Sequence, residues 1–343
     1  MIQSSCHMGT LVGSRFKPAW WLTNPHLQTL WPTLFRRIPA PPCRFEIVST
    51  SDEDILELDW CGEQGPVVIL LHGLTGSFRS QYIRGMQWAI LKRGWRSVVL
   101  NFRGCGRQPN RSARCYHSGE TGDLDFLYRR IRQQEPDTPL AAVGYSLGGN
   151  VLLKWLGEEA GRTGLFAACA VSVPLELAKC ADRMDRGLSR LYRERLLWEL
   201  KHYMAGKILH LEKLDMFEEA AKLRSLGDLN DIHSFWEYDD RVIARLYPFR
   251  DVSDYYGRCS SRAFLPNIQV PTLLIQARDD PFMTPDVIPP PEETSSQMLL
   301  EITDHGGHVG FIEAGKWHQP VYWLEQRIPE FLASRYQEKQ LNL

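Results

Sequence analysis

The order of hydrophobic and polar positions predicts alternating strands and helices through the first half of the chain. Short runs of branched and aliphatic residues are typical of strands buried on both faces, and apolar residues with a 3.6-residue period indicate helices. In chain order the expected elements are strand 67–71, helix 81–92, strand 97–101, helix 123–133, strand 140–145, helix 147–159 and strand 165–172. Repeated strand–helix units of this kind predict the α/β class, with a mostly parallel central sheet flanked by helices.

The segments before this alternation differ from it in hydrophobic pattern and in composition. Residues 44–49 and 55–60 alternate as two strands around a polar turn, which predicts a hairpin at the start of the main domain. Residues 1–43 are rich in proline and tryptophan, a composition that disfavours long helices but supplies large apolar anchors. We therefore expect residues 1–43 to form an ordered extension that wraps on the main body.

The strand pattern stops between 175 and 262, where helical periodicity takes over. The expected helical stripe consists of Leu188, Leu191, Tyr192, Leu196, Leu200 and Tyr203. Charged residues crowd the positions between them, as on the solvated face of a helix. This segment is predicted to be a helical cap inserted into the domain.

The sheet pattern resumes at 271–276 and 298–302, and an amphipathic helix is expected over 317–336. The predicted α/β core therefore consists of residues 44–174 and 263–343, interrupted by the cap.

Composition narrows the class of protein. With 43% hydrophobic and 24% charged residues among 343, the chain can bury a substantial core. Its 40 basic and 41 acidic residues leave a net charge of −1, which provides no positive field for nucleic acid. The longest apolar run, 165–173, is too short to span a bilayer, so we expect no stable membrane insertion. Peripheral contact with lipid remains open.

The termini and cysteines indicate a cytoplasmic protein. Residues 1–20 include Arg15 and Lys17 but no continuous hydrophobic segment of the secretory type. The eight cysteines are scattered and form no C-x-x-C pair, which argues against a zinc ribbon or a redox motif. Most of them are expected to be reduced.

A candidate nucleophile lies between the strand 140–145 and the helix 147–159. Gly144-x-Ser146-x-Gly148 is the pattern of a nucleophile elbow, in which a sharp turn lifts a serine hydroxyl above the edge of the sheet. The turn is so tight that the positions two before and two after the serine must lack bulk. We identify Ser146 as the candidate nucleophile.

A serine needs a base to accept its proton and a carboxylate to orient that base. Asp279 and Asp280 follow the strand 271–276, and His305 and His308 follow the strand 298–302. The order serine, aspartate, histidine is that of α/β-hydrolases. We favour Asp280 over Asp279, and His308, which lies in a glycine-rich loop, over His305.

Backbone donors for an oxyanion are expected at two places. The loop 72–76 directly follows the first long strand and can supply the Leu74 N–H, while the Leu147 N–H follows the nucleophile. His72 is interpreted as shaping this loop. A metal site at His305 and His308 is disfavoured, because two histidines three apart on a glycine-rich loop lack a helical face that would fix ligands.

Seven short motifs, distributed over almost the whole chain, resemble the YheT-like branch of the α/β-hydrolases. That branch is itself similar to eukaryotic α/β-hydrolase-domain esterases and phospholipases and to yeast medium-chain acyl-ester enzymes. The motifs are N-P-H-L-Q-T at 24–29, H-G-L-T-G at 72–76, N-F-R-G-C-G at 101–106, Y-H-S-G-E-T at 116–121, G-Y-S-L-G-G at 144–149, D-D-P-F at 279–282 and G-G-H-V-G-F at 306–311. The resemblance implies a serine carboxylesterase-type triad, whereas the cap matches no motif of the family.

The expected function is therefore hydrolysis of carboxylic esters without cofactor or metal, on a small acyl ester or lipid substrate. An acyltransferase that uses an alcohol in place of water is the enzymatic alternative. A lipase acting at a membrane surface and a catalytically inactive binding protein with the same fold are further alternatives. Acyl-chain length, alcohol moiety and oligomeric state do not follow from the sequence.

Overall fold

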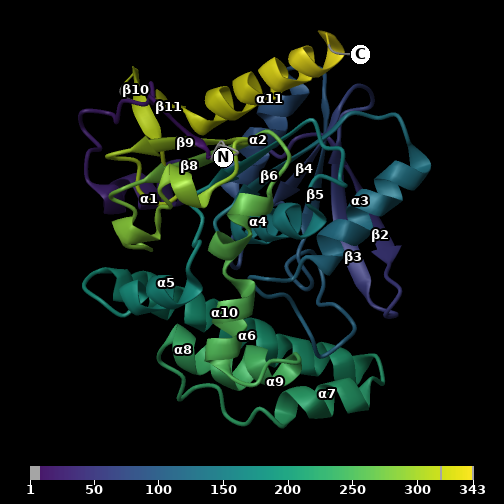
Figure 1. Ribbon diagram of the computed structural model, residues 1–343. Coiled ribbons are helices and arrows are strands. Elements are labelled where there is room, and N and C mark those ends of the chain that lie inside the picture. The colour runs from purple at the N-terminus through teal and green to yellow at the C-terminus, as the bar shows by residue number, and fades with distance from the viewer. Residues whose placement is uncertain (1–7, 317–318, 342–343) are drawn as a thin grey trace, which may run out of the picture.

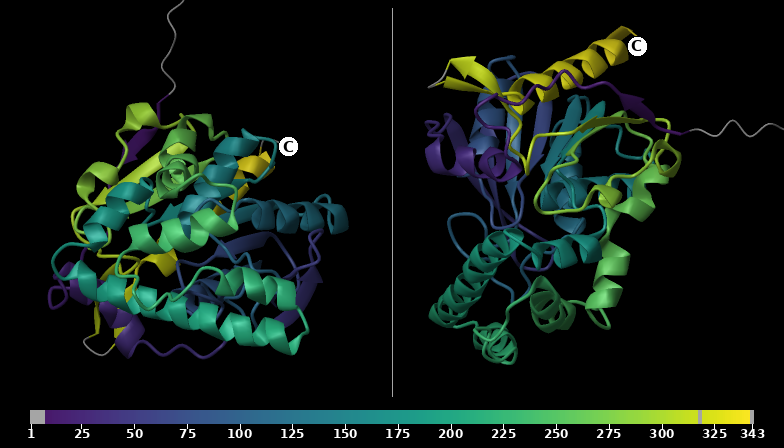
Figure 2. Two further views of the ribbon diagram at one scale, coloured as in Figure 1. Left: turned by 90° about the horizontal axis from the view of Figure 1, so that it is seen from below. Right: turned by 90° about the vertical axis from the view of Figure 1, so that its left-hand side faces the viewer.

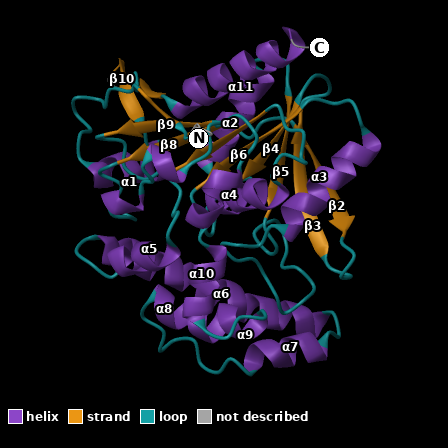
Figure 3. Cartoon of the chain, viewed as in Figure 1, coloured by secondary structure: helices purple, strands orange, loops and turns teal. Residues whose placement is uncertain are grey.

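The computed structural model describes residues 8–316 and 319–341, and within them a nine-stranded sheet forms the centre of the molecule (Figures 1 and 3). The strand order is β1-β9-β8-β7-β6-β4-β5-β3-β2. All neighbours pair in parallel except β2 with β3 and β3 with β5. The strands are β1 (Thr10–Val12), β2 (Cys43–Ser49), β3 (Ile55–Cys61), β4 (Val67–Leu71), β5 (Arg96–Asn101), β6 (Leu140–Tyr145), β7 (Ala167–Val171), β8 (Thr272–Ala277) and β9 (Met298–Thr303).

Helices cover both faces of this sheet, as the alternation of buried residues along a strand requires. Val68 and Leu70 of β4 point into an apolar cluster shared with α2 (Gln81–Leu91) and α11 (Leu324–Leu341). Val67, Ile69 and Leu71 point into the opposite cluster, shared with α3 (Gly122–Gln134) and α4 (Leu147–Glu159). The mostly parallel sheet with flanking helices that the sequence predicts is therefore confirmed.

The strongest sequence patterns also predict their boundaries. Strands 67–71 and 140–145 and helix 147–159 have the predicted ends. The helix expected over 317–336 is placed wrongly, because a two-stranded sheet of β10 (Ile312–Lys316) and β11 (Gln319–Tyr322) precedes α11, which begins at Leu324. Residues 317–318 of that prediction lie outside the described residues.

The N-terminal extension is more regular than its composition suggests. Residues 10–12 form β1, which adds an edge strand to the main sheet. Helix α1 (Pro25–Phe35) begins where the Asn24 side chain accepts hydrogen bonds from the N–H groups of His26 and Leu27. Pro25 occupies the first helical position, where its fixed φ favours a helix. The prolines therefore do not prevent helix formation in this extension.

The segment 175–262 forms a helical layer at one edge of the sheet (Figures 1 and 2). Its helices are α5 (Leu177–Met184), α6 (Ser189–Lys213), α7 (Phe217–Arg224), α8 (Phe235–Tyr238), α9 (Ala244–Leu246) and α10 (Val252–Cys259). The treatment of 1–43 as extension, 44–174 and 263–343 as core and 175–262 as cap remains a proposal. None of the helices in the described part of the chain is both long and apolar enough to cross a membrane.

The apolar stripe predicted for the long cap helix is partly wrong in its phase. Leu188 and Leu191 are exposed, whereas Leu197, Leu200 and Met204 are buried. Apolar residues occur on more than one side of α6, so periodicity alone could not decide which side packs inward.

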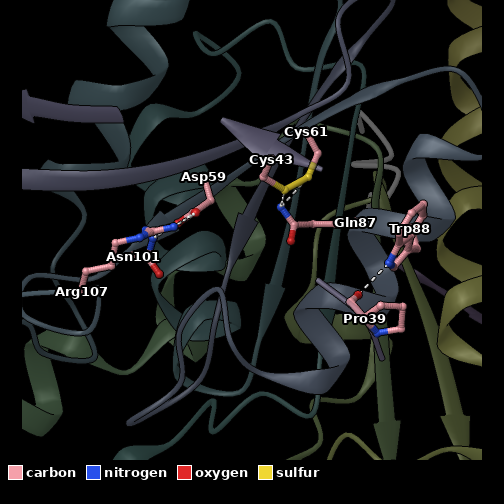
Figure 4. Close-up of a disulfide and its surroundings, with 8 residues drawn as sticks. All are labelled: Pro39, Cys43, Asp59, Cys61, Gln87, Trp88, Asn101 and Arg107. Carbon is pink, nitrogen blue, oxygen red and sulfur yellow. Dashed lines mark hydrogen bonds and ion pairs between the residues drawn. A yellow bond between two sulfur atoms is a disulfide. The ribbon is translucent and has the colours of Figure 1, made fainter. Parts of the chain in front are cut away.

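Most of the described cysteines are free, as predicted, but one pair forms a disulfide (Figure 4). Cys43 and Cys61 face each other across the β2–β3 ladder, and the Gln87 side-chain amide donates to both sulfurs at 3.3 Å. The bond depends on strand register, which the cysteine spacing does not reveal. In the same view, the Trp88 indole N–H donates to the Pro39 carbonyl at 3.0 Å and ties the extension to α2.

A buried glutamine links the extension to the C-terminal part of the core. Gln28 is fully buried, and its amide donates to the carbonyls of Leu22 at 2.8 Å and Ile312 at 3.0 Å. Its Oε1 accepts from the Ile312 N–H at 2.7 Å. Together with the Ala19 N–H, which donates to the Ile312 carbonyl at 2.9 Å, this side chain joins the extension to the start of β10.

We predict that Gln28→Ala lowers the free energy of unfolding by about 1–3 kcal/mol, because it leaves buried backbone groups without partners. Urea denaturation measures this change. The exposed Gln326 of α11 provides a control, since Gln326→Ala should shift the free energy by less than about 0.5 kcal/mol. Equal losses in the two variants would contradict this role of Gln28.

Candidate active site

The turn that carries Ser146 joins β6 to α4 and is strained. Ser146 has φ 52° and ψ −121°, values that an L-residue rarely adopts. A Cβ at Gly144 would lie 2.4 Å from the Gly148 carbonyl oxygen, and one at Gly148 would lie 2.5 Å from that of His72. Both glycines are therefore required by close backbone approach, as the motif indicates.

Ser146, His308 and Asp280 are linked by two consecutive contacts at hydrogen-bond distance, with His308 in the middle. Ser146 Oγ is 2.9 Å from His308 Nε2, and His308 Nδ1 is 2.8 Å from Asp280 Oδ2. The Asp280 side chain is 1% exposed, and its Oδ1 accepts from the Phe282 N–H at 2.8 Å. The carboxylate is thus held with one oxygen directed at the imidazole.

The alternative residues form a separate pair. Asp279 Oδ2 lies 3.2 Å from His305 Nδ1, and Asp279 Oδ1 accepts from the Gly307 N–H at 3.0 Å. Burial raises the pKa of the Asp279 carboxyl, although these hydrogen bonds oppose the rise. The pair shapes the loop that precedes His308 and does not contact Ser146.

The two residues expected to supply backbone donors for an oxyanion line the same cavity as Ser146. Leu74 and Leu147 both line it, and neither N–H donates a hydrogen bond within residues 8–316 and 319–341. Leu147 is the first residue of α4, where an N–H has no partner inside the helix and the helix dipole favours negative charge. The chemistry available here is stabilisation of an anion beside Ser146.

The loop that carries Leu74 is shaped by hydrogen bonds to side chains. The Tyr82 hydroxyl accepts from the Gly73 N–H at 2.9 Å, and the Tyr116 hydroxyl accepts from the Thr75 N–H at 3.0 Å. His72 Nε2 accepts from the Phe102 N–H at 3.1 Å, so Nδ1 carries the proton and donates to the Gly73 carbonyl at 2.8 Å. Burial lowers the pKa of His72 to about 4, and the neutral ring acts as a structural link.

Three residues that position His308 were missed by sequence reasoning. The Thr29 hydroxyl of α1 accepts from the His308 N–H at 2.9 Å and donates to the Pro25 carbonyl at 2.8 Å. Ser172 Oγ accepts from the Val309 N–H at 3.0 Å, and the Phe282 ring stacks on the imidazole with centroids 4.0 Å apart. Thr29 lies in the motif at 24–29 and Phe282 in the motif at 279–282, so the motifs contained a signal that residue chemistry alone did not interpret.

A cavity with about 940 Å³ of empty space, part of it open to solvent, lies between the sheet edge and the cap. Ser146 and His308 line it from the core. Much of the remaining lining is apolar and includes Leu147, Leu177, Met184, Leu196, Leu200 and Met283. Such a cavity can accept a hydrocarbon chain next to the serine hydroxyl. Across residues 8–316 and 319–341, no group of three or more His, Cys, Asp or Glu side chains could hold a metal ion.

Comparison with known proteins gives the same fold. A family profile described as alpha/beta hydrolase fold matches residues 66–315. The Escherichia coli protein YheT, provisionally named an esterase, is 40% identical over 331 residues, which cover 95% of each chain. Mouse phospholipase ABHD3 is 29% identical over 337 residues, covering 94% of this chain and 79% of its own. A solved Pyrococcus furiosus esterase matches with a TM-score of 0.55 and 18% identity over 86% of this chain and 91% of its own, a likeness of fold.

We predict that Thr29→Val slows modification of Ser146 by a fluorophosphonate about tenfold, because the loop that holds His308 loses a hydrogen bond and the base is misplaced. Intact-protein mass spectrometry measures the rate. Thr33→Val is the matched control, since Thr33 lies one turn further along α1 and is exposed. Equal rates in the two variants, with unchanged unfolding curves, would show that Thr29 does not position the base.

Proposed function

Since the chain belongs to the α/β-hydrolase family and to its YheT-like branch, we propose that it is a serine esterase that hydrolyses carboxylic esters through an acyl-enzyme. The predicted family and fold class are both confirmed, and the chain is an esterase-type hydrolase. The observation that carries the proposal is the contact of Ser146 Oγ with His308 Nε2 at 2.9 Å. A buried carboxylate, Asp280, supports the imidazole from the other side.

In the proposed first half-reaction, the Ser146 oxygen attacks the acyl carbon while His308 accepts the hydroxyl proton. Asp280 holds the imidazole with Nδ1–H directed at its carboxylate and stabilises the imidazolium that forms. The Leu74 and Leu147 N–H groups donate to the oxyanion of the tetrahedral intermediate. The imidazolium then protonates the leaving alcohol, and the acyl group remains on Ser146.

In the second half-reaction, His308 removes a proton from the water that attacks the acyl carbon. The imidazolium then returns this proton to Ser146 Oγ as the bond between Oγ and the acyl carbon breaks and the carboxylic acid leaves. The same base and the same oxyanion donors serve both halves, so no cofactor or metal is required by this scheme.

The proposed substrate class is small acyl esters or lipids. The apolar lining beside Ser146 supports an acyl or alkyl chain in the cavity. The related mouse protein is named a phospholipase, which favours a lipid among the possible esters. We also propose that the enzyme meets such lipids by peripheral contact.

We predict that Ser146→Ala lowers the turnover of p-nitrophenyl esters at least about 10⁴-fold, because the acyl-enzyme cannot form. The substrates range from acetate to palmitate, so the wild-type series also measures the length of the cavity. The variant should keep the unfolding curve of the wild type. Undiminished turnover in Ser146→Ala would exclude Ser146 as the nucleophile.

A second prediction separates the two adjacent carboxylates. Asp280→Asn should lower kcat about 10³- to 10⁴-fold, because an amide cannot hold the required tautomer of His308 or stabilise its charge. Asp279→Asn should lower kcat less than about tenfold, since Asp279 pairs with His305 and the Gly307 N–H. The reverse ranking of the two variants in steady-state kinetics would assign the acid to Asp279.

A further inference from the structure

Several polar groups in the cavity beside Ser146 already have partners inside the protein. The Tyr255 hydroxyl accepts from the Ser118 N–H at 2.9 Å, and the Tyr203 hydroxyl donates to Asn110 Oδ1 at 3.0 Å. Both tyrosines line the cavity, so these hydroxyls serve the fold even though their rings face the open space. Apolar surface and satisfied hydroxyls suit a plain hydrocarbon chain.

Asp239 departs from this pattern. It follows α8, begins the short π-helical turn η1 (Asp239–Ile243) and lines the same cavity as Ser146. Its Oδ2 accepts from the Tyr256 hydroxyl at 2.7 Å. The backbone N–H and carbonyl of Asp239 bond within the helical turns, but no other hydrogen bond and no ion pair reaches its side chain from residues 8–316 or 319–341. One carboxyl oxygen is therefore left without a protein donor at the cap side of the cavity.

The surroundings of Asp239 make it unfavourable in free energy for this free oxygen to lose contact with water. Burial raises the pKa of the Asp239 carboxyl to about 7, although the Tyr256 hydroxyl opposes the rise. Water in the cavity can satisfy the free oxygen, but a bound hydrocarbon chain would displace that water. A plain chain would then leave a buried acceptor unpaired, which is more costly than a missing contact between apolar groups.

Building on the proposed esterase function, we propose that the enzyme selects esters whose cavity-bound chain ends in a hydrogen-bond donor, a hydroxyl or an ammonium group, that binds Asp239. Such a group would occupy the free carboxyl oxygen while the rest of the chain contacts the apolar lining. Sites built to bind a substrate hydroxyl reject the analogue that lacks it more strongly than apolar pockets reject a methylene. Asp239 is then a specificity-determining residue, distant in sequence from the residues of the reaction.

A purely structural role for Asp239 makes a different prediction. If Asp239 serves only to accept from Tyr256, then Asp239→Asn retains an acceptor oxygen at the same place. The Asp239→Asn variant would then change kcat/KM to the same extent for esters with and without a terminal donor. The ratio of their kcat/KM values therefore separates the two roles, whatever the variant does to turnover in general.

The experiment compares ethyl esters of ω-hydroxy and ω-amino acids with ethyl esters of unsubstituted acids of the same length. The rate of hydrolysis is measured from the release of protons. A second set carries the terminal hydroxyl on the alcohol side, as ω-hydroxyalkyl acetates. These arms show whether the acyl or the alcohol chain reaches Asp239. The proteins are the wild type, Asp239→Asn and Asp240→Asn, which makes the same change at the next residue, on an exposed side chain.

We expect that, at one chain length or more, the wild type prefers the donor-bearing ester over the plain one. In assays above pH 7, where the Asp239 carboxyl is mostly ionised, the preference should fall about tenfold in Asp239→Asn, because a charge-assisted hydrogen bond is lost, and should be retained in Asp240→Asn. Preferences that are the same in the wild type and Asp239→Asn at every length, with Ser146-dependent turnover of the plain esters, would overturn this inference and leave the esterase function intact.

A binding measurement covers the case in which no ester is hydrolysed, which would count against the proposed function. Calorimetry then compares unhydrolysable ketone analogues, in which a methylene replaces the ester oxygen, with and without a terminal hydroxyl. Tighter binding of the hydroxy ketone, lost in Asp239→Asn, supports the donor site independently of catalysis. Equal binding of both ketones by the wild type overturns it.

Discussion

The strained backbone at Ser146 is the constraint on which the other features of the site depend. A positive φ at a residue other than glycine costs about 1–3 kcal/mol, and the surrounding structure must offset that cost. The Ser146 N–H donates to the Val171 carbonyl of β7 at 2.8 Å, and residues 147–157 of α4 are all buried. A turn held by a neighbouring strand and a buried helix keeps the hydroxyl raised above the sheet edge. The same turn places the free Leu147 N–H beside it.

The histidine comes to this fixed point on a loop that other segments hold. Thr29 reaches it from the N-terminal extension, and Ser172 reaches it from the residue after β7. Gln28, next to Thr29, is bonded to Ile312, which follows the same loop. The extension is therefore a support of the candidate site as well as a cover for the core. This explains physically why its sequence contains a motif that aligns with a hydrolase family.

The sequence predicted the central elements well where each local signal agreed with the fold. The strand 140–145, the turn and the helix 147–159 were predicted because alternation, glycine spacing and helical periodicity changed together at Ser146. Which carboxylate faces His308 could not be derived from spacing, because Asp279 and Asp280 are adjacent and the turn decides where each points. The roles of Thr29 and Ser172 were equally hidden, since hydroxyls that bond loop backbone leave no periodic pattern. The disulfide between Cys43 and Cys61 depended on strand register.

Two charged residues of the cap, Lys207 and Asp239, differ in how the fold satisfies their polar atoms. Lys207 is fully buried, and its ammonium donates to the carbonyls of Ala113 at 3.2 Å and Arg114 at 2.7 Å. Burial lowers the pKa of Lys207 to about 8. Both hydrogen bonds tie α6 to a loop of the core, and they offset the free-energy cost of burying the ammonium group.

Asp239 has one such bond and an open side toward the cavity. A folded chain gains nothing from leaving one oxygen of a partly buried carboxyl without a protein donor, and an apolar residue would pack against the same lining at lower cost. The difference between the two residues therefore separates a charge whose hydrogen bonds hold the cap on the core from one that has an oxygen left free toward the cavity. That contrast makes the cap side of the cavity, which no family motif covers, the region where this enzyme's choice of substrate is decided.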